Sequence, residues 1–140
     1  MEYNMNTASI ELSVRELCAR VLNSGDLEYG GGRALAERGR LGADIHRRIQ
    51  RERSARYRAE VPLCNTTRYG ELTYTVSGRA DGIELDEDGW TVEEIKTMHS
   101  RAFAFPVPEI YLAQLRIYGY FWCMEKDLGG RRKAIRPAGI

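Results

Sequence analysis

Three residues near the middle of the chain, Asp81, Glu94 and Lys96, have types and spacing that could support catalysis. Two strand-like runs carry them, separated by an acidic turn at Asp86–Gly89. Antiparallel strands joined by such a turn fold back on each other, so Asp81 and Glu94 are expected at the same end of a hairpin. Alternate strand residues face the same way, which places Glu94 and Lys96 on one face and Glu93 on the other. The pattern predicts two carboxylates and a lysine at one point.

Two carboxylates with open coordination positions suit Mg²⁺ or Mn²⁺, which prefer oxygen ligands and complete their shells with water and phosphate. The backbone carbonyl of Ile95 is a further candidate ligand. A metal ion held there would polarise a phosphate and lower the pKa of a bound water, while Lys96 would orient or deprotonate that water or neutralise developing charge. The alternative is that the acids only form a solvated turn. We adopt this interpretation for the three acids at the tip of the hairpin: Asp86, Glu87 and Asp88.

Two helices are predicted before this hairpin. The first begins after Ser13, which forms a capping-box pattern with Glu16, and ends before Gly25. A glycine-rich loop follows, and then a longer helix over residues 34–57. Its narrow apolar stripe repeats every fourth residue and consists of Leu41, Ile45 and Ile49. The pattern therefore predicts two helices, separated by a glycine-rich loop, before the strands.

Period-2 alternation predicts strands at 59–65, 71–85 and 90–97, which form an antiparallel meander. A last helix is expected over residues 110–126. This order favours an α+β fold, with a central, mainly antiparallel or mixed sheet flanked by helices. We expect a flexible N-terminus at 1–12, one domain at 13–126 and a basic tail at 127–140.

The composition excludes several classes of protein. A chain of 140 residues has room for one domain, and its formal net charge of +1 neither indicates nor excludes a nucleic-acid partner. The three cysteines, Cys18, Cys64 and Cys123, lack metal-site spacing and are expected to be buried, reduced thiols. No apolar stretch is long enough to cross a bilayer and no signal peptide is evident, so no membrane partner and a cytoplasmic location are expected.

The segments GRADGI and VEEIKT resemble the D…E-x-K core of the PD-(D/E)XK nuclease superfamily. An upstream helix with GADIH, ending at His46, and a downstream QLRIY at Gln114–Tyr118 are similar to the superfamily's RecB-type branch. These four elements occur in the expected order over most of the chain. The chain further resembles the N-terminal nuclease domain of bacterial XPD-like DNA helicases in three segments: SVREL, VLNSGDL and IHRRIQRE. Two departures are Ala80 in place of the superfamily's proline and a last strand missing or reduced to KAIRP.

The resemblance implies a restriction-endonuclease-like αβββα core in which Asp81 and Glu94 hold Mg²⁺ or Mn²⁺ and Lys96 serves catalysis. It also implies that His46 is an auxiliary metal ligand, which favours manganese because imidazole is a poor ligand for magnesium. Without the resemblance, His46 would be a surface helix residue. Gln114 and Tyr118 share a helical face and would bond a phosphate or a catalytic acid, although both could equally belong to the core.

The remaining polar candidates have simpler alternatives. A row of arginines is either a solvated helix face or a set of phosphate contacts, and consists of Arg47, Arg48, Arg51 and Arg53. Glu60 could touch the site from the sheet edge but is more typical of an exposed strand end. His99 is interpreted as a loop residue.

We therefore expect a divalent-metal-dependent deoxyribonuclease, of the exonuclease kind, that serves DNA repair with a helicase motor in cis or in trans. The main alternative is a catalytically inactive nucleic-acid-binding or docking module with the same fold. A third interpretation, a domain for protein contacts alone, explains none of the residue coincidences. Exonuclease against endonuclease action, polarity, strand preference, cleavage of RNA and oligomeric state stay open.

Overall fold

The computed structural model describes residues 1–4, 8–22, 32–96 and 108–126, without the side chains of 3, 4 and 32–39. Along the chain its elements are β1 (Glu2–Asn4), β2 (Ser9–Ser13), α1 (Val14–Val21), α2 (Gly32–Arg51), β3 (Tyr57–Tyr69), β4 (Leu72–Asp86), β5 (Gly89–Glu93) and α3 (Glu109–Glu125). The fold is α+β, as the sequence predicts. His99, Thr97 and the predicted tail at 127–140 lie outside the described residues.

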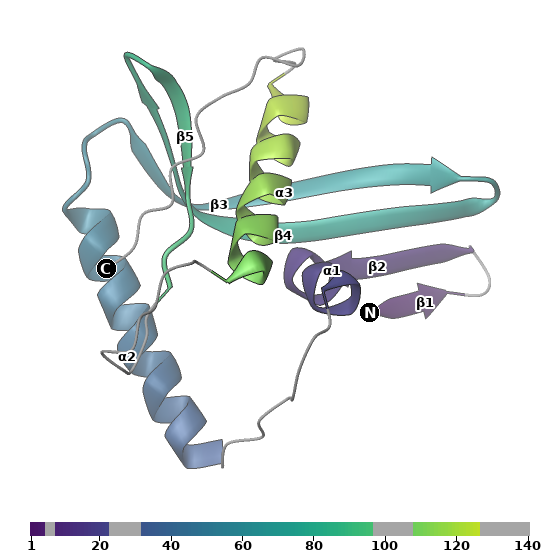
Figure 1. Ribbon diagram of the computed structural model, residues 1–140, viewed down its shortest axis with the longest axis horizontal. Helices are drawn as coiled ribbons and strands as arrows, with labels where there is room; N and C mark the ends of the chain where they lie inside the picture. Colours follow the sequence, from purple (N-terminus) through teal and green to yellow (C-terminus); the bar gives the residue numbers. More distant parts are fainter. Residues whose placement is uncertain (5–7, 23–31, 97–107, 127–140) are drawn as a thin grey trace.

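Strand β4 is the centre of the sheet (Figure 1). It pairs antiparallel with β3 along almost its whole length and antiparallel with β5 at its C-terminal end. Its N-terminal half also pairs with β2, in parallel, and β2 pairs antiparallel with β1. The expected meander of three strands is therefore confirmed, and the sheet is mixed.

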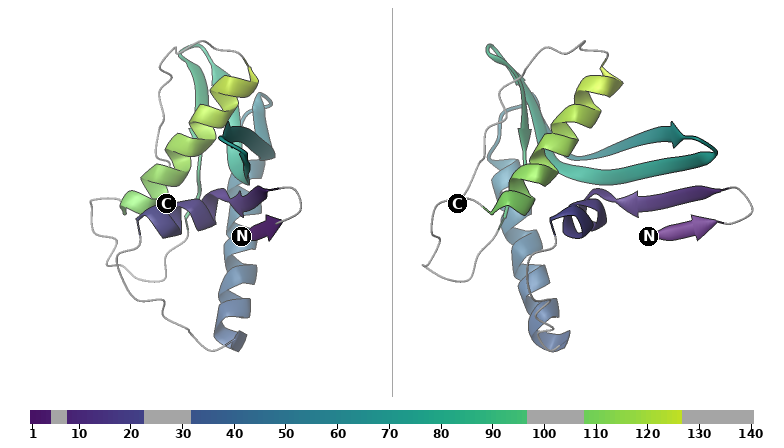
Figure 2. Two further views of the ribbon diagram at one scale, coloured as in Figure 1. Left: turned by 90° about the vertical axis from the view of Figure 1, so that its right-hand side faces the viewer. Right: turned by 45° about the vertical axis from the view of Figure 1, so that its right-hand side comes forward.

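Helices α1 and α3 pack against each other and against β4, whereas α2 lies apart from them and reaches the sheet at β4 (Figures 1 and 2). The paired ends of β3 and β4 extend well beyond α3 as a long hairpin. The main apolar core lies between α1, α3 and the sheet. Its buried members are Val14, Cys18, Val61, Leu63, Ala80, Ile83, Val92, Leu115, Tyr118, Phe121 and Trp122.

The expected first helix is confirmed in detail at its start. The Ser13 side chain accepts a hydrogen bond from the Glu16 amide at 3.0 Å, and the Glu16 carboxylate accepts one from the Ser13 amide at 2.8 Å. This capping box satisfies backbone groups that the helix leaves without partners. Helix α3 also agrees with the prediction to within one residue at each end.

Three expectations about local structure are wrong. The N-terminal residues 1–12 are not loose throughout, because β1 and β2 gain complete ladders with neighbouring strands that local composition does not reveal. The second helix ends at Arg51 rather than at Tyr57, since Tyr57 instead pairs with Glu84 as the first residue of β3. Residues 66–69, which lie between the first two predicted strands, continue β3, so the turn begins at Gly70.

Burial agrees only in part with the sequence prediction. Along the expected stripe of α2, Ile49 is buried and Ile45 is half-buried, but Leu41 is exposed. Of the cysteines, Cys18 is buried, Cys123 is half-buried and Cys64 is exposed on β3. The prediction that all three are buried is therefore confirmed for Cys18 alone. None of the helices in the described ranges is long and apolar enough to cross a lipid bilayer.

Candidate active site

The β4–β5 hairpin brings Asp81 next to the residues that follow β5. Its last registered pair joins Gly82 with Glu93, so Asp81 and Glu94 are the next residues along the two strands. The Asp81 Oδ2 accepts a hydrogen bond from the Ile95 amide at 2.5 Å. The predicted convergence at one end of the hairpin is confirmed, and the tight turn that creates it is stabilised by the Asp88 amide, which donates to Asp86 Oδ1 at 2.8 Å.

Glu94 and Lys96 meet as predicted, although the strand expected over 90–97 ends at Glu93 and both residues follow it. The Lys96 Nζ lies 2.7 Å from Glu94 Oε1, and the two side chains are 24% and 10% exposed, respectively. The same ammonium group lies 5.1 Å from the centre of the Tyr111 ring of α3, which is favourable for a cation. Glu93 is turned the other way and pairs with Arg53, whose Nη2 lies 2.6 Å from its Oε2. The two adjacent glutamates therefore belong to different environments.

Helix α2 carries His46 to the same place. Its Nδ1 lies 3.5 Å from Asp81 Oδ1, and both side chains are largely buried. One carboxylate oxygen of Asp81 thus contacts the Ile95 amide, which follows β5, and the other contacts His46 of α2. His46 is the only one of the metal-ligand candidates that comes from outside the hairpin.

Burial disfavours the charged form of both carboxylates. It raises the pKa of Asp81, an effect that the hydrogen bond from the Ile95 amide and the electrostatic interactions with His46 and Lys96 oppose. Burial also raises the pKa of Glu94, and the negative charge of Asp81 raises it further, while Lys96 opposes both. Among the described residues, Glu94 Oε2 is buried and has no hydrogen-bond partner. A proton or a cation at that oxygen would relieve this cost.

Gln114 and Tyr118 lie on the buried face of α3, as expected from their spacing. Tyr118 packs on β4 at Gly78, where an added Cβ would lie 2.9 Å from the phenolic oxygen. Burial, followed by the charge of Glu94, raises the pKa of Tyr118 to about 12, so its hydroxyl stays protonated near the carboxylates. Gln114 is only 3% exposed, and its expected contact with phosphate stays a prediction.

The arginine row of α2 divides into two groups. Arg47, Arg48 and Arg51 are exposed, and Arg47 is paired with Asp44 one turn away. Arg53, just beyond the end of α2, is also exposed, but it pairs with the buried Glu93. The exposed residues keep their predicted role as candidates for phosphate contact.

Glu60 is closer to the site than a strand end would be. It lies within β3 opposite Asp81, between the registered pairs on either side, and has a positive φ of 54°. Its Oε1 accepts a hydrogen bond from Gln50 at 2.9 Å, and its Oε2 lies 3.9 Å from Arg79. Sequence reasoning did not single out Gln50, although its position one helical turn after His46 is a usable signal.

The oxygen and nitrogen donors at this site are of the types that bind a hard divalent cation. Within the described ranges, no three histidine, cysteine, aspartate and glutamate side chains gather closely enough to hold a metal ion together. The available donors are His46, Asp81 and Glu94, and the buried Glu94 oxygen without a hydrogen-bond partner is one that a cation or a proton would satisfy. The coordination by the Ile95 carbonyl stays a prediction.

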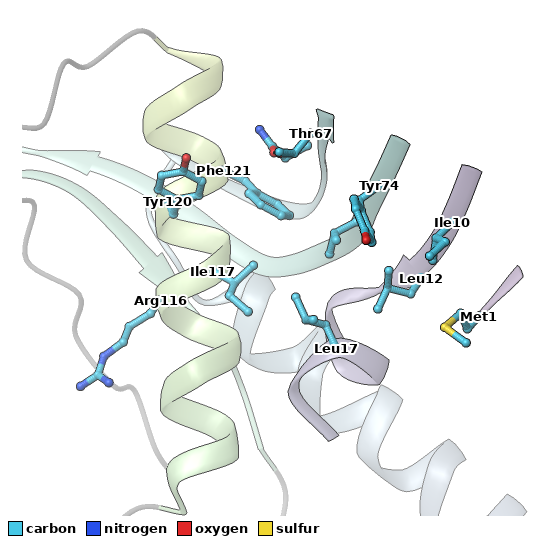
Figure 3. A pocket seen from close by; sticks show the side chains of 12 residues that line it. Met1, Ile10, Leu12, Leu17, Thr67, Tyr74, Arg116, Ile117, Tyr120 and Phe121 are labelled. Carbon is cyan, nitrogen blue, oxygen red and sulfur yellow. The ribbon is translucent and has the colours of Figure 1, made fainter. Parts of the chain in front are cut away.

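An apolar groove of about 590 Å³ lies elsewhere, between α1, α3, β2 and the outer part of the β3–β4 hairpin (Figure 3). Leu12, Leu17 and Ile117 point into it, and Arg116 and Tyr120 lie at its α3 side. None of the carboxylates described above lines this groove. It is therefore separate from the candidate active site.

No protein-family model matches the sequence, and no curated protein matches it. Among solved structures, the chain is similar to the crystal structure of SSO0001, with a TM-score of 0.59 and 25% sequence identity. The similarity covers 80% of this chain and 56% of the SSO0001 chain, so this chain spans about half the length of that protein.

Proposed function

We propose that this chain is a divalent-metal-dependent nuclease that hydrolyses phosphodiester bonds in DNA. The proposal is carried by one observation: a buried carboxylate pair, Asp81 and Glu94, meets a lysine 2.7 Å from one acid and an imidazole 3.5 Å from the other. This combination of hard oxygen donors, one imidazole and one ammonium group suits metal-assisted phosphoryl chemistry. It also has the order and spacing of the D…E-x-K resemblance.

The residues divide the work by their chemistry. Asp81, Glu94 and His46 would hold Mg²⁺ or Mn²⁺, which when bound polarises the phosphate and acidifies a water molecule. The water oxygen forms the new bond to phosphorus, the bond to the leaving oxygen breaks, and the proton lost by the water passes through solvent to that oxygen. An ammonium group donates hydrogen bonds and cannot accept a proton, so Lys96, paired with Glu94, is suited to orient the water and stabilise negative charge on the phosphate.

A second candidate function is a nucleic-acid-binding or docking module that does not cut. One observation favours it: the described residues contain no ready-made group of three metal ligands. In that case the exposed arginines of α2 would bind phosphate and the carboxylates would only shape the surface. A helicase motor, in cis or in trans, is a fitting partner for either function.

The deciding experiment uses DNA labelled at the 5′ or 3′ end, single- or double-stranded, incubated with Mn²⁺, Mg²⁺ or a chelator. We expect cleavage that needs the metal, with manganese more effective because of His46. Asp81→Asn should abolish metal binding measured by calorimetry. Lys96→Ala should lower the cleavage rate by roughly 10²- to 10⁴-fold while DNA binding stays near that of the parent protein.

Lys126→Ala is the matched control for the lysine substitution, because Lys126 ends α3 and lies over the Trp122 ring at 4.7 Å. It should cleave at the parent rate. Parent-like cleavage by Lys96→Ala would remove the catalytic assignment. Salt-sensitive DNA binding by a parent protein that takes up no metal would favour the non-cutting module.

A further inference from the structure

The backbone of Asp81 is held from two directions. Its carbonyl oxygen accepts a hydrogen bond from Gln50 Nε2 at 2.8 Å and lies 3.3 Å from the Tyr57 hydroxyl. Gln50 comes from the last turns of α2, and Tyr57 is the first residue of β3. Two side chains from separate elements therefore meet at the main chain of the central site residue.

Gln50 and His46 are one helical turn apart and share a face of α2. His46 approaches the Asp81 carboxylate, while Gln50 binds the Asp81 carbonyl. The distance between imidazole and carboxylate thus depends on how α2 is docked on this residue. Gln50 also donates to Glu60, whose positive φ is costly for a residue with a side chain and needs support from its surroundings.

Tyr57 connects the same point to a buried ion pair. Its hydroxyl lies 2.9 Å from Glu93 Oε1, and the other oxygen of Glu93 is paired with Arg53. Its ring lies against Gly82, where an added Cβ would be 1.8 Å from the hydroxyl oxygen. Only glycine at that position leaves room for Tyr57 to reach Asp81.

We propose that Gln50 and Tyr57 are positioning residues that set the geometry of His46 and Asp81 for metal binding. The inference rests on the proposed function and extends it to residues that would touch neither metal nor substrate. Partners that orient the ligands of a metal site typically change metal affinity or activity by about 10- to 100-fold when they are replaced. Gln50 and Tyr57 occupy that position relative to Asp81 and His46.

The test uses Gln50→Met and Tyr57→Phe, which keep side-chain size and remove the hydrogen-bond donors. Tyr69→Phe is the matched control, because Tyr69 is 77% exposed at the distal end of the β3–β4 hairpin. Calorimetry with Mn²⁺ should show a dissociation constant raised by about 10- to 100-fold in both variants and unchanged in the control. Cleavage should recover when Mn²⁺ is raised, and KM for DNA should stay at the parent value.

A second measurement needs no metal. The imidazole proton resonances of His46 should shift in both variants of the metal-free protein and stay in place in Tyr69→Phe. Parent-like Mn²⁺ affinity and unshifted resonances in a folded Gln50→Met would overturn the inference. If Tyr57→Phe does not fold, the half-buried Gln50 position decides the question. A parent protein that binds no Mn²⁺ would overturn the proposed function as well, a result visible before any variant is compared.

Discussion

The Glu94 carboxylate is buried in a place where one charged partner, Lys96, contacts it. One oxygen is paired with Lys96, and the other is buried with no hydrogen-bond partner in the described part of the chain. Burial and the negative charge of Asp81 raise the pKa of Glu94, an effect that Lys96 opposes, so ionisation of this carboxyl is less favourable in the folded protein than in the unfolded chain. Residues that serve function often reduce stability in this way.

We therefore expect Glu94→Gln to stabilise the metal-free protein at pH 8. A raised pKa means that the folded state binds more protons than the unfolded state, so the contribution of Glu94 to stability falls as the pH rises. The variant should gain about 3 to 5 °C in Tm, the shift that roughly 1 kcal/mol gives a domain of this size. Thermal denaturation followed by circular dichroism measures it.

The gain should fade as the pH falls below the ordinary pKa of a glutamate, about 4.3, because the acid is then neutral in both states. Glu87→Gln, in the exposed turn, is the matched control and should change Tm little at either pH. A variant at position 94 that is less stable than the parent at pH 8 would contradict the argument.

Cysteine reactivity gives a prediction that does not depend on function. Cys18 is 1% exposed in the core, and burial raises the pKa of its thiol, so it should react slowly with iodoacetamide. Cys64 is exposed on β3 and should react first. Mass spectrometry of the native protein after brief labelling at pH 8 distinguishes them, and equal labelling of both residues would contradict the described core.

The chemistry at Asp81, Glu94 and Lys96 could be predicted because all three lie in one hairpin, where strand alternation and one turn determine which residues meet. The contacts of Gln50 and Tyr57 with Asp81 could not be predicted, since they join residues 31 and 24 positions apart, although the spacing of Gln50 from His46 places both on one helix face. Local periodicity carries no information about such distant pairs. His46 was accessible only through the resemblance.

At the scale of elements, β4 links the core to the candidate site. Ala80 and Ile83 both belong to the core although they are three residues apart, whereas regular alternation puts only every second residue on one face. The change of face occurs at Asp81 and Gly82, opposite the positive φ of Glu60. Local irregularity of this kind is common beside functional sites.

Gly82→Ala tests that region of β4. The new Cβ would lie less than 2.5 Å from three atoms of the Tyr57 side chain. Tyr57 must therefore move away from Asp81. We expect a loss of roughly 1 to 3 kcal/mol in the free energy of unfolding, typical of overpacking. Urea denaturation measures it.

Gly70→Ala provides the comparison, because Gly70 has a φ of 61° and nothing within 4 Å of an added Cβ. There the cost comes from the backbone alone and should be about 1 kcal/mol. A Gly82→Ala variant as stable as the parent would contradict the close packing of Tyr57.

The helices and the antiparallel meander could be predicted from capping and periodicity, which are local signals. Strands β1 and β2 could not, because β2 is stabilised by pairing with β4, about 60 residues later in the chain, and β1 pairs in turn with β2. The capping box at Ser13 predicted the start of α1 correctly, yet it gave no sign that Ser13 also ends β2.

At the scale of the whole molecule, the net charge of +1 says little about partners, and the arrangement of charge matters instead. Arg47, Arg48 and Arg51 are exposed on the helix that carries His46. If they bind DNA phosphates, each lost contact should reduce the slope of log affinity against log salt by about 0.9.

We expect this reduction for Arg48→Ala and Arg51→Ala, and a smaller one for Arg47→Ala because Asp44 already pairs with that arginine. Arg68→Ala is the matched control at the far end of the β3–β4 hairpin, where its Nε donates to the Gly70 carbonyl at 3.2 Å. Fluorescence anisotropy with labelled DNA over a range of salt concentrations measures the slopes. Identical slopes for all four variants would exclude α2 as the DNA-binding face.

The opposite orientations of Glu93 and Glu94 also matter for comparing this chain with others. Both residues are glutamates, so an alignment displaced by one position still matches an acid to an acid and carries little penalty. It would nevertheless exchange the partner of Arg53 and Tyr57 for the partner of Lys96. The spacing to Lys96, rather than acidity, identifies the equivalent residue in any aligned sequence.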